Sequence, residues 1–356
     1  MTKLPTLKQL LIPAAHGLKR NYLQLWESKK NGKQKPDFER ETYSDNGSND
    51  QLGKLPKSLA LAIHASLCFG LIQLPSSVFS SSHGRFERAI GGQSFERGRW
   101  PWLALLKATI VTERLWFIPI SHYHLYCGGV LINREWILTA AHCFTEDGTA
   151  GLQPGNWQAR LGAVRLRPSA SQRMLDVLGR ILDDDELRQW EIDLDTIIIH
   201  PGYNRSDLYS DDIALVKLSR RAPQNNLVRP IRLPSASNQG FPAVGQTCIT
   251  KGWGCTTRGG DPSYRAREIQ LPIYSPFRCS YHFRMQHSNK RLCAGYRNRG
   301  IGVCSGDSGS PLVCMSAEDY TLAGVVSFAS RNRPESFPAV FTRVQAYLPW
   351  IYSVIY

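Results

Sequence analysis

A serine lies between glycines in the stretch Cys304-Ser305-Gly306-Asp307-Ser308-Gly309. Glycines permit a sharp turn and let a substrate carbonyl approach the backbone closely, so Ser308 is a candidate nucleophile. In such a turn the N–H groups of Gly306 and Ser308 point toward one spot, where they would stabilise an oxyanion. A plain surface turn is the alternative, because Gly and Ser are common in turns.

A candidate base and a candidate acid precede this serine in the chain. His142 follows an apolar run, and the carboxylates of Asp211 and Asp212 stand at the head of the buried-strand pattern Ile213–Leu218. A serine nucleophile needs a base to take its proton and an acid to orient that base. The residue types and their order therefore predict nucleophilic catalysis, with either aspartate as the acid.

These three motifs resemble those of the trypsin/chymotrypsin family of serine proteases, over Ala89 to Tyr356. The resemblance implies a catalytic triad of His142, Asp212 and Ser308, since the family's acid directly precedes Ile-Ala-Leu. It implies an all-β fold of two packed six-stranded antiparallel β-barrels with a C-terminal helix, and short strand-like runs do recur along this part of the chain. The implied reaction is hydrolysis of protein or peptide substrates through an acyl-enzyme, without a cofactor or a metal.

The same resemblance locates the primary specificity pocket. Trypsin-like members carry an aspartate where this chain has Gly302, so a substrate Arg or Lys would lack a buried partner. We therefore expect a preference for apolar residues such as Leu, Met or Phe before the scissile bond. Arg331 and Arg333 are expected near the rim of this pocket, which leaves open a preference for acidic substrate residues. The residues expected around this pocket are Gly302, Val303, Ser327, Phe328, Ala329 and Ala339.

The junction Arg88-Ala89 resembles the family's activation site. Cleavage after Arg88 by a trypsin-like protease would free the α-ammonium of Ala89, which would fold inward and pair with Asp307. A buried ammonium is tolerable only with such a partner. The resemblance also implies inhibition by serpin- or Kunitz-type proteins.

The cysteines indicate an oxidising compartment. Eight of the nine lie between residues 89 and 356, an even set that favours disulfides, and no Cys-x-x-Cys pair supports zinc. The resemblance implies the pairs Cys127–Cys143, Cys248–Cys314 and Cys279–Cys293. Cys255 and Cys304 are left over, and since the loop with Cys255 lies near the nucleophile loop in this family, we expect a fourth bridge between them.

The composition divides the chain into four segments. Residues 1–57 form a basic polar segment with 11 Lys/Arg against 6 Asp/Glu, and residues 58–79 form an apolar signal-anchor or signal-peptide segment. A buried soluble helix is a further interpretation of 58–79. The family resemblance implies that residues 80–88 are a propeptide linker and that 89–356 are the protease domain. The expected location is extracellular, either secreted or as a type II single-pass membrane protein.

The net charge, an acidic run, a glycosylation sequon and two unusual residues can each be interpreted with or without a function. The net charge of +14 indicates a solvated basic surface rather than a nucleic-acid site, since no basic run is interleaved with stacking aromatics. The acidic run Asp183–Glu186 is open to interpretation as a calcium site, since the family's relatives bind calcium in a nearby loop, but consecutive carboxylates without the spacing of a calcium loop favour a solvated charge run. Asn204-Arg205-Ser206 is a glycosylation sequon. The family usually has a larger aliphatic residue where this chain has Ala89, and a glycine where it has Ser310. These two departures leave an alternative function open: a weak or inactive protease homologue that acts as a binding module.

Overall fold

The computed structural model describes residues 90–116, 118–182, 184, 187–238, 240–285, 289–317, 319–330 and 332–356. These residues belong to one compact unit, Glu87–Tyr356. The predictions for segments 1–57, 58–79 and 80–88, including Arg88, lie outside the described residues. So do the predictions for Ala89 and Arg331 and for Asp183, Asp185 and Glu186 in the acidic run.

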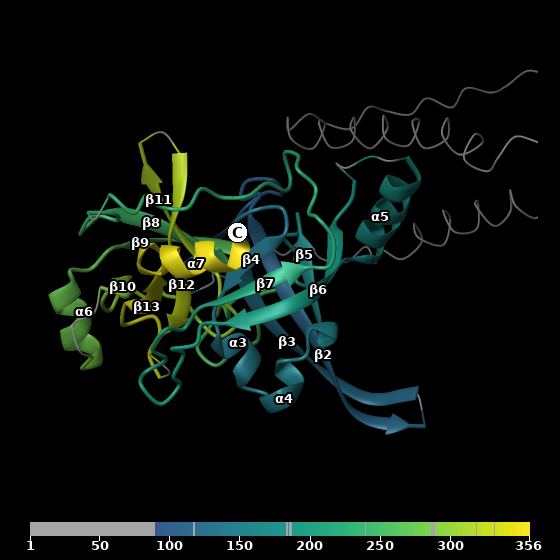
Figure 1. The fold of residues 1–356 in the computed structure, drawn as a ribbon, viewed down its shortest axis with the longest axis horizontal. Coiled ribbons are helices and arrows are strands. Elements are labelled where there is room, and N and C mark those ends of the chain that lie inside the picture. Colours follow the sequence, from purple (N-terminus) through teal and green to yellow (C-terminus); the bar gives the residue numbers. More distant parts are fainter. Residues whose placement is uncertain are drawn as a thin grey trace, which may run out of the picture. The chain divides into compact units, whose positions relative to one another are not determined.

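The first half of the unit is a closed antiparallel barrel (Figure 1). Along β6 the residues alternate between buried and exposed, with Trp190, Ile192 and Leu194 facing inward, as expected for a strand with one face in a core. In barrel order the strands are β2 (Leu103–Leu115), β3 (Ile118–Leu131), β4 (Trp136–Thr139), β7 (Ala214–Leu218), β6 (Trp190–Ile199) and β5 (Trp157–Leu161).

The second half is a seven-stranded sheet that curls on itself. β1 pairs with the start of β9, and an isolated bridge joins Ile273, directly after β9, to Ala294 in β10 at the far end of the sheet. In sheet order the strands are β1 (Gln93–Ser94), β9 (Arg267–Pro272), β8 (Thr247–Gly252), β11 (Pro311–Ser316), β12 (Asp319–Phe328), β13 (Ala339–Arg343) and β10 (Arg291–Ala294). The predicted all-β class is thereby confirmed.

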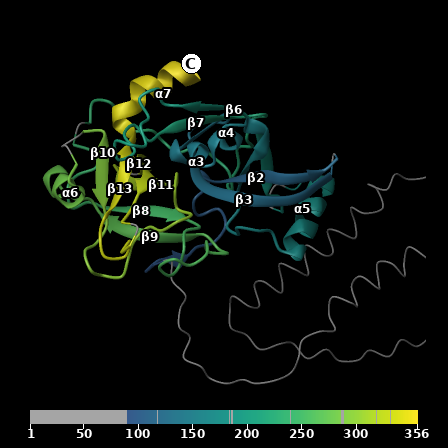
Figure 2. The same cartoon turned by 90° about the horizontal axis from the view of Figure 1, so that it is seen from below.

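The helices are short and lie around the sheets (Figure 2). They are α3 (His142–Thr145), α4 (Gly148–Gly151), α5 (Ala170–Leu182), α6 (Pro276–Phe283) and α7 (Leu348–Ile355), with 3-10 turns at Pro154–Asn156 and Val344–Tyr347. The predicted C-terminal helix is α7, whose Ile351 packs into the core of the first barrel. Within the described ranges no helix has both the length and the apolar character needed to cross a bilayer.

Two stretches between the site motifs contain regular structure. Lys107–Tyr126 lies in the hairpin of β2 and β3, where Thr109, Ile110 and Tyr123 favour strands because they are β-branched or aromatic. Ser171–Asp193 contains most of α5 and the first residues of β6.

Four disulfides cross-link the unit, and they join the four expected pairs. Three follow the family pattern, and the fourth joins the loop after β8 to the nucleophile loop. They are Cys127–Cys143, Cys248–Cys314, Cys279–Cys293 and Cys255–Cys304.

Candidate active site

The register of two neighbouring strands brings His142 and Asp212 together. β4 ends at Thr139, opposite Ala214 at the start of β7. His142 begins α3 three residues later, and Asp212 lies two residues before β7. The imidazole Nδ1 and Asp212 Oδ2 are 2.8 Å apart, and the backbone N–H of His142 donates to Asp212 Oδ1 at 3.0 Å. These bonds orient the ring.

Two hydroxyls from the second half hold Asp212. Ser327 in β12 donates to Asp212 Oδ2 at 2.5 Å, and Thr342 in β13 donates to the Asp212 carbonyl oxygen at 2.7 Å. The aspartate is only 1% exposed, so these bonds replace water that it would otherwise need. The sequence indicated Ser327 but not Thr342, since nothing in the pattern of β13 distinguishes that threonine from other strand residues.

The neighbouring carboxylate, Asp211, turns away from the imidazole. Its Oδ1 accepts hydrogen bonds from Lys290 Nζ at 2.7 Å and from the Tyr347 hydroxyl at 2.6 Å. Its backbone has a φ of +49°, a left-handed turn that sends consecutive side chains in different directions. Of the two candidate acids, Asp212 is therefore the one that contacts His142.

Burial and charge act in opposite directions on this pair. Burial alone would lower the pKa of His142, but the negative charge and hydrogen bond of Asp212 outweigh it and raise the pKa above its ordinary value of 6.5. Burial would raise the pKa of Asp212, yet the charge of His142 and the bonds from His142 and Ser327 lower it. The arrangement favours a charged aspartate beside an imidazole that gains a proton readily.

Ser308 sits on a turn that two glycines allow. Gly306 and Gly309 have φ values of +97° and +75°, which L side chains rarely adopt. The Ser308 carbonyl accepts from Gly128 N–H at 2.7 Å, which fixes the turn against β3. The amides of Gly306 and Ser308 donate no hydrogen bond to another residue that the structure describes. They are thus available to an external acceptor.

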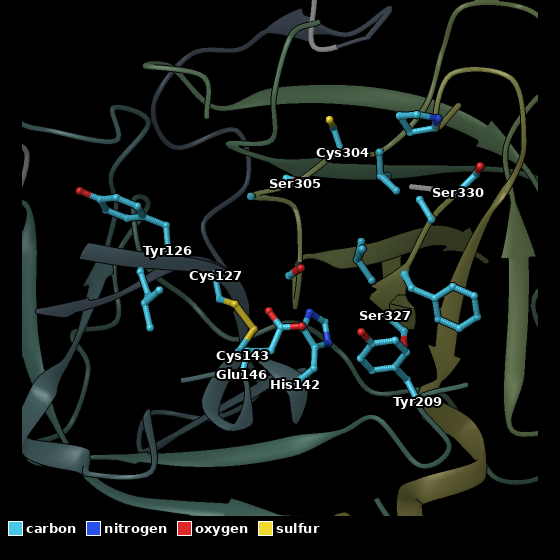
Figure 3. Close-up of a pocket in the computed structure, with 18 of the residues that line it drawn as sticks. Tyr126, Cys127, His142, Cys143, Glu146, Tyr209, Cys304, Ser305, Ser327 and Ser330 are labelled. Atoms are coloured by element: carbon cyan, nitrogen blue, oxygen red, sulfur yellow. A yellow bond between two sulfur atoms is a disulfide. The ribbon is translucent and has the colours of Figure 1, made fainter. Parts of the chain in front are cut away.

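His142 and Ser308 line the same cleft, of about 800 Å³. No hydrogen bond between described residues joins the Ser308 hydroxyl to the imidazole; such bonds often tighten only when substrate is bound. Figure 3 shows the imidazole between the Cys127–Cys143 disulfide and the ring of Tyr209. Tyr209 meets His142 edge-on at 5.6 Å between ring centroids and stacks with Phe328 at 5.8 Å.

The residues expected around the specificity pocket divide into two groups. Val303, Ser327, Phe328 and Ala329 line the cleft. Gly302 and Ala339 are not among the residues that line this cleft. Ala339 is 3% exposed within the core of the second half.

The space beside Gly302 is filled by another loop. A Cβ atom at Gly302 would overlap the carbonyl oxygen of Pro334. Pro334 itself lines the cleft and stands where the side chain of residue 302 would have been expected. Nothing in the sequence pattern points to Pro334, since its place depends on how the loop after β12 folds back.

Asp307 is buried beside the nucleophile. Its carboxylate accepts from Gly254 N–H at 2.8 Å and from Cys304 N–H at 3.0 Å. Burial raises the pKa of Asp307 to about 6, and the two backbone bonds oppose this rise only in part. Nearby, the carbonyl of Ile90 accepts from Gly302 N–H at 3.0 Å, so the chain directly after the expected cleavage site is docked beside the loop that leads to Asp307.

Three further expectations concern Ser310, the glycosylation sequon at Asn204 and metal binding. Ser310 is fully buried, and its hydroxyl has no hydrogen-bond partner among the described residues. Asn204 of the sequon is exposed, next to Arg205 on the cleft wall. No group of three or more His, Cys, Asp or Glu side chains in the described part of the chain is placed to hold a metal ion.

A histidine held by a buried aspartate, sharing a cleft with a serine on a glycine turn, defines the arrangement of the serine proteases. The family model described as Trypsin matches residues 89–351, and the chain belongs to this family. A similar protein is transmembrane protease serine 9 of Rattus norvegicus, 33% identical over 269 residues. The match covers 75% of this chain but 22% of that relative, so the chain spans about a fifth of the relative's length.

Proposed function

We propose that the protein is a serine endopeptidase in which Ser308, His142 and Asp212 form the triad. The observation that carries the proposal is the hydrogen bond of 2.8 Å between His142 Nδ1 and Asp212 Oδ2, in a cleft that Ser308 also lines. The free amides of Gly306 and Ser308 support their role as the oxyanion hole.

In the proposed reaction the Ser308 oxygen forms a bond to the substrate carbonyl carbon while His142 takes the hydroxyl proton. The oxyanion accepts hydrogen bonds from the two amides. When the intermediate collapses, the C–N bond breaks, His142 gives the proton to the leaving amine, and the acyl-enzyme remains. Water, deprotonated by His142, then releases the acid and restores Ser308. Asp212 stabilises the imidazolium throughout.

The proposed substrates are proteins or peptides with an apolar residue before the scissile bond. This rests on the absence of a carboxylate among the cleft-lining residues Val303, Phe328, Ala329 and Pro334 around the expected pocket. A substrate Arg or Lys would lose its hydration there without gaining an opposite charge.

We further propose that the chain is a zymogen, activated when a trypsin-like protease cleaves after Arg88. The buried Asp307 carboxylate and the docked Ile90 support a pairing of the new Ala89 ammonium with Asp307. The family relationship also supports regulation by serpin- or Kunitz-type inhibitors. The eight paired cysteines support an extracellular location, secreted or tethered as a type II membrane protein, and glycosylation at Asn204 would fit its exposure.

A fluorophosphonate probe, which bonds covalently to an activated serine, tests the catalytic proposal on the cleaved protein. We expect stoichiometric labelling of Ser308 and amide hydrolysis that Ser308→Ala lowers by about 10⁴-fold or more. An unlabelled, correctly folded and cleaved protein would instead favour the alternative, a binding module that has lost catalysis.

A further inference from the structure

Pro334 lines the cleft and belongs to residues 332–336, which we call the pocket loop. None of the four disulfides includes a residue of this loop. Its position depends on noncovalent contacts. At its far end the Ser336 carbonyl accepts from Asn298 N–H at 3.1 Å, and a turn joins Ser336 N–H to the Arg333 carbonyl at 3.0 Å. Pro334 faces the cleft, and Glu335 directly follows it in the chain.

An ion pair ties this end to the loop after β8. Arg258 donates to Glu335 Oε1 at 2.7 Å, and Arg258 and Pro334 both line the cleft. The Glu335 side chain is 19% exposed and that of Arg258 58%. The other carboxylate oxygen, Oε2, is buried without a hydrogen-bond partner among the described residues. The Ser336 hydroxyl also donates to Oε1, but at 3.4 Å, so Arg258 is the main partner that compensates the Glu335 charge.

The base of Arg258 is itself fixed to the nucleophile loop. Three residues before it, Cys255 is bonded to Cys304, and Cys255 N–H donates to the Ser305 carbonyl at 3.0 Å. The ion pair thus connects the pocket loop to a segment that is cross-linked to the loop of Ser308. In the same loop as Glu335, Pro334 covers Gly302 closely. A Cβ atom added at Gly302 would overlap the Pro334 carbonyl oxygen.

We propose that the Arg258–Glu335 ion pair sets the depth of the specificity pocket. It holds Pro334 over Gly302, so that loop backbone closes the end of the pocket. The pocket then suits Leu or Met better than the longer Phe. Arg258 and Glu335 act here as positioning residues. This inference rests on the proposed peptidase function and adds which apolar residues that function favours.

The test compares uncharged peptide substrates that differ only in having Phe or Leu before the scissile bond. Enzyme concentrations are set by fluorophosphonate titration of the full chain after cleavage. Both Arg258→Gln and Glu335→Gln should raise the Phe/Leu ratio of kcat/KM by up to about 5-fold, the range expected of a partly exposed ion pair. The charge exchange R258E/E335R should bring the ratio back toward that of the wild type.

Glu135→Gln is a matched control, because it removes the carboxylate of the Arg221–Glu135 pair (2.6 Å), whose residues do not line the cleft. Its ratio should equal that of the wild type. A purely structural role of Glu335 would lower kcat/KM for both substrates alike. Gly302→Ala, which would push Pro334 aside, should raise the Phe/Leu ratio as Glu335→Gln does.

A salt titration of the unmodified protein gives a second measurement that does not depend on the folding of any variant. Screening of the ion pair between about 0.05 M and about 1 M NaCl should raise the Phe/Leu ratio. In Glu335→Gln the ratio should not respond to salt. An unchanged ratio in labelled Glu335→Gln, or in wild type at high salt, would overturn the inference. A wild type that takes no label would overturn the proposed function, and this inference with it.

Discussion

Two adjacent carboxylates show how strongly a residue's role depends on its immediate contacts. Asp212 contacts His142, whereas Asp211 pairs with Lys290 and Tyr347. We predict that Asp212→Asn lowers kcat/KM by about 10⁴-fold, because an amide donor would hold the imidazole in the wrong tautomer. Asp211→Asn, the matched control, should stay within a few-fold of wild type. Equal losses in steady-state assays of the two variants would show that the acid has been assigned wrongly.

The environment of His142 also predicts how activity depends on pH. Since the imidazole acts as a base, only its neutral form starts the reaction, and activity falls as the pH drops through its pKa. Asp212 raises that pKa above 6.5, so the acid limb of kcat/KM should lie above pH 6.5. A pH–rate profile with its acid limb below that value would contradict the pairing of His142 with a charged aspartate.

The nucleophile loop contains the buried carboxylate of Asp307. In the uncleaved chain Ala89 has no free ammonium group that could neutralise it. A folded pKa of about 6 against the ordinary 3.8 means that folded Asp307 binds its proton more tightly than the unfolded chain does. Its contribution to stability is therefore full below about pH 4 and is lost as the pH rises through about 6. This difference between the folded and the ordinary pKa of Asp307 corresponds to about 3 kcal/mol in the free energy of unfolding.

Asp307→Asn in the uncleaved chain should therefore raise the free energy of unfolding at pH 8 and remove this loss between pH 4 and pH 6. Denaturant unfolding across that range measures both effects. After cleavage the same variant should be inactive, because the Ala89 ammonium would have no partner. A cleaved Asp307→Asn protein with wild-type activity would argue against the activation mechanism.

The disulfide between Cys255 and Cys304 joins two loops of the site, 49 residues apart in sequence. In the loop-entropy model, removal of the bridge with Cys255→Ser and Cys304→Ser lowers the free energy of unfolding by about 4 kcal/mol. Thermal unfolding of oxidised wild type and the double variant measures the effect. If peptide mapping of active protein finds both thiols free to alkylation, the bridge does not form in solution.

At the scale of the whole molecule, the eight cysteines after Arg88 are all bonded to one another. None remains to bond Cys68, the one cysteine in the sequence before the expected cleavage site. We predict that cleavage after Arg88 separates residues 1–88 from the protease unit, with a new N-terminus Ala-Ile-Gly-Gly. A non-reducing gel should show two fragments. Fragments that separate only after reduction would reveal a bridge absent from this structure.

Local sequence determined the chemical groups of the site and the class of fold. His142, Ser308 and the flanking glycines are recognisable without a structure, because a nucleophile turn needs particular residue types at fixed spacing. The strand runs are likewise local, since one buried face imposes an alternating or continuous apolar pattern. The cysteine pairs could be anticipated only through resemblance, because spacing alone leaves many pairings open.

Tertiary structure alone decided what depends on contacts between distant segments. The support of Asp212 by Thr342 follows from the contact of β13 with the segment before β7, which no local pattern records. Gly302 occupies the expected sequence position, yet Pro334 covers it, because the pocket loop folds back and is held there by Arg258. Sequence position identifies which side chains are present, but the shape of a pocket depends on which loops pack over them, and that is set by long-range contacts.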